Sequence, residues 1–155
     1  MTSQPHSSGM SPEEAFANSY YHFVEALKIL AADAEFQCDV MGNYNVAWEL
    51  KHDVSAGSCM LTLTSGELTK QQRDGIAGIV AALDEIPDSV LEGGTTAAVN
   101  KRAMHHPCWI PLRARAAELL TLLSSATSRN EAFLQQVTGP DSSHLPACGS
   151  CDDVP

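Results

Sequence analysis

Hydrophobic residues recur at helical spacing along most of the chain, and the clearest run follows a corner that contains Trp109. Pro107 and Pro111 flank this tryptophan. Proline disfavours a helical residue before it but suits the first turn of a new helix, so Trp109 is expected at a corner between two helices. The helix that follows has one apolar stripe, formed by Leu112, Ala116, Leu119, Leu120 and Leu123. Such a stripe must be buried against other elements.

A second strong pattern begins at Ser11. A serine N-cap, Pro12 in the first turn and Glu14 three residues after the serine form a typical capping box. Its apolar face comprises Phe16, Tyr20, Phe23, Val24, Leu27, Leu30, Ala31 and Ala34. We expect this helix to end near Gln37 and to pack against the 112–123 stripe.

The segment from residue 45 to residue 64 is ambiguous. Alternating apolar and polar positions over residues 46–54, followed by the strand-like residues 59–64, would form a β-hairpin. Against this, residues 47–51 are mostly good helix formers, Gly57 suits a helix C-terminal cap, and an isolated hairpin is marginally stable. We favour the helix, with the hairpin as the alternative.

Another helix is expected from Thr69, where Thr69 and Gln72 form a possible capping box, to Pro87, which ends it. It carries a row of small residues, Gly75, Gly78 and Ala82. Each interior glycine costs roughly 1 kcal/mol relative to alanine, so the close approach of another helix would compensate for this row.

Two shorter helices complete the pattern. One is expected from Thr95 or Thr96 to about His105, and the other from a capping box at Ser128 to the stop at Gly139. The sequence therefore predicts a mainly α protein, a single-domain bundle of about five to six helices over residues 11–138. A flexible leader over residues 1–10 and a flexible tail over residues 139–155 are expected to flank it. The alternative is an α+β fold with one hairpin at residues 45–64.

Composition narrows the class further. The 155-residue chain shows no secretory signal pattern and no apolar run long enough for a membrane span, so we expect a soluble, cytoplasmic protein. Its five cysteines are odd in number and irregularly spaced, which favours free thiols over a disulfide framework.

The net charge of -10 is concentrated in the first 95 residues, which hold 14 acidic and four basic residues. This balance disfavours nucleic-acid binding, which needs a basic face, but suits a basic protein partner. The richest acidic run, Asp84, Glu85, Asp88 and Glu92, precedes a glycine pair. These four residues and Trp109 are the candidate partner-binding residues.

Metal binding is the rival function. Cys148 and Cys151 have the spacing of a ligand pair, but a structural zinc site needs four ligands. The remaining candidates are His105, His106, Cys108 and His144. Ligands from both clusters would have to meet across the fold, which the sequence does not establish.

No catalytic residue is predicted, because the chain lacks a phosphate-binding loop and a nucleophile elbow. The sequence favours a non-enzymatic, acidic protein-binding module, an inhibitor of the immunity type or an escort of a basic partner. The alternative is a zinc-binding module or a metal-dependent enzyme. The analogy with immunity proteins and acidic secretion chaperones rests on composition only.

Overall fold

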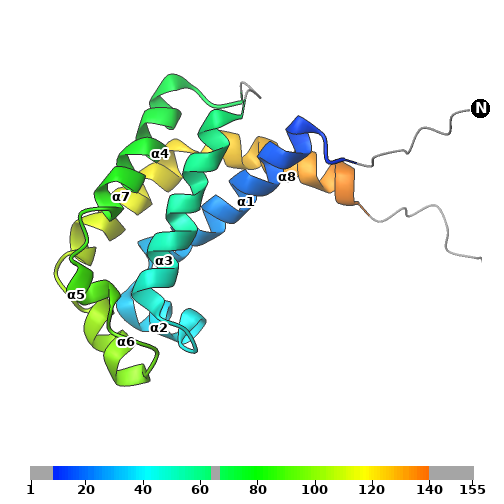
Figure 1. Cartoon of the computed structure of the whole chain (residues 1–155). Coiled ribbons are helices and arrows are strands. Elements are labelled where there is room, and N and C mark those ends of the chain that lie inside the picture. The colour runs from blue at the N-terminus through cyan, green and yellow to red at the C-terminus, as the bar shows by residue number, and fades with distance from the viewer. Residues whose placement is uncertain (1–8, 64–66, 140–155) are drawn as a thin grey trace, which may run out of the picture.

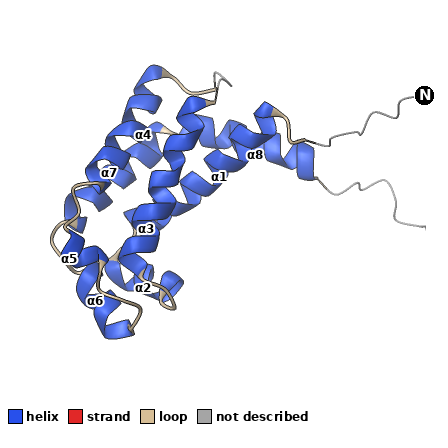
Figure 2. Ribbon diagram, viewed as in Figure 1, coloured by secondary structure: helices blue, strands red, loops and turns tan. Residues whose placement is uncertain are grey.

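All regular structure in the described chain, residues 9–63 and 67–139 of a computed structural model, is helical (Figures 1 and 2). The elements are α1 (Pro12–Ala31), α2 (Ala34–Met41), α3 (Val46–Ser55), the 3-10 helix η1 (Ala56–Thr62), α4 (Lys70–Leu83), α5 (Asp88–Leu91), α6 (Ala97–Met104), α7 (Trp109–Leu122) and α8 (Ser124–Thr138). The mainly α class is confirmed, but these residues form eight α-helices, not five to six. Most of the expected leader and tail lies outside the described residues.

The first expected helix is in fact two helices, which accounts for part of the difference in number. α1 begins as predicted, with both hydrogen bonds of the Ser11–Glu14 capping box present. It ends at Ala31, and the side chain of Asp33 accepts a hydrogen bond from the backbone N–H of Phe36 at 2.8 Å to start α2. The apolar stripe continues across this break, which is why hydrophobic periodicity did not reveal it.

The hairpin alternative is wrong, because α3 and η1 cover residues 46–62. The side chain of Asn45 caps α3 by accepting from the backbone N–H of Trp48 at 3.2 Å. The residues buried on α3 are Val46, Ala47, Leu50 and Val54, which lie on one helical face. Gly57 is buried in η1 against the ring of Phe23, where a Cβ atom would clash.

The expected break before the last helix is also wrong. α8 begins at Ser124, with only Leu123 between it and α7, and Ser128 lies inside α8, not at its start. The Ser128 hydroxyl donates to the carbonyl of Ser124 at 3.1 Å, one turn earlier. From the local sequence alone, a serine that forms this hydrogen bond inside a helix cannot be told from a serine that caps the N-terminus of a helix.

The predicted packing of α1 against α7 is confirmed, and α1 also contacts α3, η1 and α8. In Figure 1, α2, α5 and α6 gather at one end of the molecule, whereas α8 and the start of α1 lie at the other end. Leu27 and Leu30 of α1 and Ala116 and Leu123 on the α7 side are fully buried, and Leu120 is only partly buried. One core therefore extends along α1.

The small-residue row of α4 faces another helix closely, as expected, and that helix is α7. A Cβ atom on Gly75 would lie 2.8 Å from Cδ1 of Leu119, and one on Gly78 would lie 3.2 Å from Nη2 of Arg115. The absence of these side chains lets the two helices approach closely.

Leu27→Ala tests the core. Because Leu27 is fully buried, this change is expected to lower the free energy of unfolding by about 2 to 5 kcal/mol in denaturant melts. Val40→Ala on the exposed face of α2 is the control and should change stability little. A loss below about 1 kcal/mol for Leu27→Ala would contradict its place in the core.

Candidate functional site

The acidic run identified in the sequence lies on the surface, and we call its four residues, Asp84, Glu85, Asp88 and Glu92, the acidic corner. All four are exposed. α4 ends at Leu83, and Pro87 directly precedes the single turn of α5. As expected from Pro87, the four carboxylates do not lie on one continuous helix.

Buried apolar side chains support the acidic corner from below. Ile86, Val90 and Leu91 are at most 9% exposed. Asn45 at the start of α3 donates from Nδ2 to the carbonyl of Leu91 at 2.7 Å, which ties α5 to α3. The charges therefore stand on a packed segment.

The carboxylates of the acidic corner are largely unneutralised. Within the described chain, the only ion pair that any of the four forms is between Asp84 Oδ1 and Lys51 Nζ, at 3.7 Å. Three negative charges thus face solvent without a basic partner. Such charges attract a cationic group from a distance set by ionic strength.

A groove of about 310 Å³ lies beside Glu85, between the end of α4 and the start of α7. It is lined by Ala82, Glu85, Ile86, Cys108, Pro111, Leu112 and Arg115. We call it the α4–α7 groove. Its apolar lining can hold the aliphatic stem of a lysine or arginine while the charged end reaches Glu85.

Trp109 lies at the predicted corner between α6 and α7, but it is not a surface residue. Its side chain is fully buried, and its Nε1 donates to the carbonyl of Ala103 at 3.0 Å. The corner turns the ring inward, so Trp109 holds α6 against α7. The expectation that it contacts a partner directly is corrected accordingly.

His105 and His106, which precede Trp109 between α6 and α7, have other partners. Nε2 of His105 lies 3.2 Å from Oε1 of Glu35, and Nζ of Lys101 lies 3.4 Å from the same oxygen. The hydrogen bond from His105, followed by the charge of Lys101, lowers the pKa of the Glu35 carboxyl. Nδ1 of His106 accepts from the backbone N–H of Cys108 at 3.1 Å.

The described residues contain no group of three or more His, Cys, Asp or Glu side chains arranged to hold a metal ion. His105, His106 and Cys108 therefore do not form a site by themselves. His144, Cys148 and Cys151 lie outside the described residues. The zinc alternative that depends on them stays a hypothesis.

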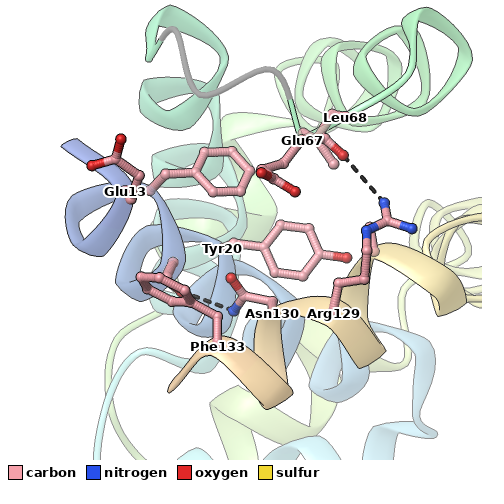
Figure 3. Close-up of a pocket in the computed structure, with 10 residues that line it drawn as sticks. Glu13, Tyr20, Glu67, Leu68, Arg129, Asn130 and Phe133 are labelled. Atoms are coloured by element: carbon pink, nitrogen blue, oxygen red, sulfur yellow. Dashed lines mark hydrogen bonds between the residues drawn. The ribbon is translucent and has the colours of Figure 1, made fainter. Parts of the chain in front are cut away.

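A feature that the sequence reasoning missed is a small cavity between α1, α8 and Leu68 (Figure 3). Its volume is about 110 Å³. The signal available in the sequence was a pair of small residues, Ala17 and Ala126, on helix faces whose other apolar residues are larger. Such alanines are common in helical cores, so they did not distinguish a cavity from close packing.

None of the helices in the described part of the chain is long and apolar enough to cross a membrane. Comparisons of the chain with protein-family models, with curated proteins and with solved structures give no significant match.

Thiol reactivity tests the environment assigned to Cys108. Burial raises the pKa of the Cys108 and Cys38 thiols, whereas Cys59 is exposed. Because the thiolate is the nucleophile, iodoacetamide at neutral pH should modify Cys59 before the other two, as read by peptide mass mapping. Denatured protein, as the control, should lose this order. Preferential modification of Cys108 in the folded protein would instead indicate an activated thiol beside Trp109.

Proposed function

We propose that this protein is a non-enzymatic binding module for a basic polypeptide, and that the acidic corner is its contact surface. The observation that carries the proposal is the combination of four exposed carboxylates, of which only one forms an ion pair among the described residues, with a mainly apolar groove beside Glu85. Charge alone is also explained by solubility. The adjoining groove adds a place for a side chain to bind.

The net charge of the chain supports the same proposal. At -10, the whole molecule attracts a basic protein, and the uncompensated carboxylates of the acidic corner concentrate that attraction locally. Electrostatic attraction of this kind acts mainly on the association rate and on the choice of partner. Inhibition of the immunity type and the escort of a basic protein both require such steering.

The α4–α7 groove would supply the short-range part of recognition. The stem of a partner lysine or arginine would pack on Ile86, Pro111 and Leu112, and its charged end would pair with Glu85. Arg115 lines the same groove, so the charged end of the partner side chain is expected to lie on the Glu85 side, away from the guanidinium group. The groove is thus expected to admit one basic side chain in one orientation.

Charge reversal tests the proposal. Short random peptides displayed on phage and selected against the full-length protein are expected to be enriched in lysine and arginine. Their association rate should fall markedly as salt rises past physiological strength, where the Debye length is below about 8 Å, and the dissociation rate should change less. Reversing Asp84, Glu85, Asp88 and Glu92 to lysine should slow association in the same way.

The matched control reverses four exposed acids outside the acidic corner, Asp39, Asp53, Glu118 and Glu131, which changes the net charge equally. Thermal melts establish that both variants fold. The control is expected to slow association much less than the corner variant, because nearby charges dominate steering. Peptides without an excess of basic residues, or an equal effect of the two variants, would contradict the proposal.

A further inference from the structure

The small cavity described above lies at the end of the molecule opposite the acidic corner, and the proposed function does not use it (Figures 1 and 3). Its walls are mainly apolar, formed by Phe16, Ala17, Tyr20, Leu68, Ala126 and Phe133. Ala17 and Ala126 are the smallest side chains in its lining. An apolar cavity of this kind is a ready site for a small apolar group.

Two polar side chains define what the inside of the cavity offers. The Tyr20 hydroxyl is already engaged, 2.8 Å from Oγ1 of Thr127 and 3.3 Å from the carbonyl of Leu123. Asn130 is only 9% exposed, and its Nδ2 donates to the carbonyl of Ala17 at 3.0 Å. Figure 3 shows its oxygen directed between the rings of Tyr20 and Phe133. The interior thus presents an amide acceptor among aromatic walls.

The mouth of the cavity carries an excess of negative charge. Glu13, Glu67 and Arg129 lie around it. Arg129 donates from Nη2 to the backbone carbonyl of Glu67 at 3.3 Å, and in the described residues it forms no ion pair with a carboxylate. Figure 3 shows the Glu67 carboxylate extending over the cavity. A cation is therefore favoured at this mouth over an anion.

We propose that this cavity binds a small branched alkylamine, with the alkyl group among the aromatic walls and the ammonium group at the mouth beside Glu67 and Glu13. The volume limits the size, because a cavity of about 150 Å³ accommodates a benzene ring and this one is smaller, at about 110 Å³. The alkyl group must therefore be no larger than a benzene ring, which restricts it to a branched chain of about four carbons. The acidic mouth selects the charge of the ligand.

The strength of the charge preference follows from the exposure of the mouth. Both glutamates are exposed, so their attraction for an ammonium group is screened by solvent. Such pairs favour binding by up to about fivefold. An alkylamine should therefore bind about fivefold more tightly than the alcohol of the same shape, and a carboxylate of that shape should bind least.

The test uses the full-length ¹⁵N-labelled protein and three probes of matched shape: isobutylamine, isobutanol and isobutyrate. Saturable amide shifts around Ala17, Leu68 and Ala126 are expected with the amine, weaker binding with the alcohol, and none with the carboxylate. Glu67→Gln should reduce the preference for the amine over the alcohol to about twofold and leave binding of the alcohol unchanged. Glu131→Gln on α8, which removes an exposed acid that does not line the cavity, should keep the full preference.

Filling the cavity is a second test. Ala126→Leu should abolish the binding of both the amine and the alcohol. If this variant does not fold, Glu67→Gln on the exposed mouth still reports on charge recognition. Equal binding of isobutyrate and isobutylamine, an unchanged preference in Glu67→Gln, or no saturable shifts at the lining residues would overturn the proposal.

Discussion

The side chain of Gln37 connects four helices and fixes the end of the molecule that carries the acidic corner. Its Nε2 lies 3.0 Å from each of three carbonyls at the end of α1, and its Oε1 accepts from Nη2 of Arg113 on α7, also at 3.0 Å. Arg113 donates further to the carbonyl of Met104, the last residue of α6. The final carbonyls of a helix lack partners within that helix, and each one buried unpaired costs about 1 to 3 kcal/mol. One amide on α2 thus satisfies the end of α1 and, through Arg113, joins it to α6 and α7.

Side-chain amides also pair with backbone groups at other helix ends of this protein. Asn100 on α6 accepts from the backbone N–H of Val46 at 3.0 Å and donates to the carbonyl of Tyr44 at 2.8 Å, which seats the start of α3. Asn45 then ties α3 to α5. These links place the acidic corner and the walls of the α4–α7 groove on fixed supports. A surface held in this way loses little conformational entropy on binding, which favours recognition by few contacts.

Local signals predicted much of the fold, and tertiary contacts determined the rest. Ser11 and Thr69 cap helices because their capping boxes involve only neighbouring residues. The α1–α2 break was missed because the apolar stripe continues across it, although the Asp33 cap that starts α2 involves only neighbouring residues. The exposure of the acidic run could be predicted from its charge. The burial of Trp109 could not, because it depends on how α6 meets α7. The cavity and the groove arise between helices distant in sequence, so no local pattern revealed them.

Chemical-shift mapping of the ¹⁵N-labelled full-length protein with a short lysine-rich peptide tests the central claim most directly. Shifts confined to residues 84–92 and 108–115, saturating with one peptide bound per chain, would support recognition at the acidic corner and the α4–α7 groove. Shifts spread over the exposed acids of all helices, Asp53, Glu118 and Glu131 included, would contradict it. The charge of this protein would then act as a diffuse field and not as a binding site.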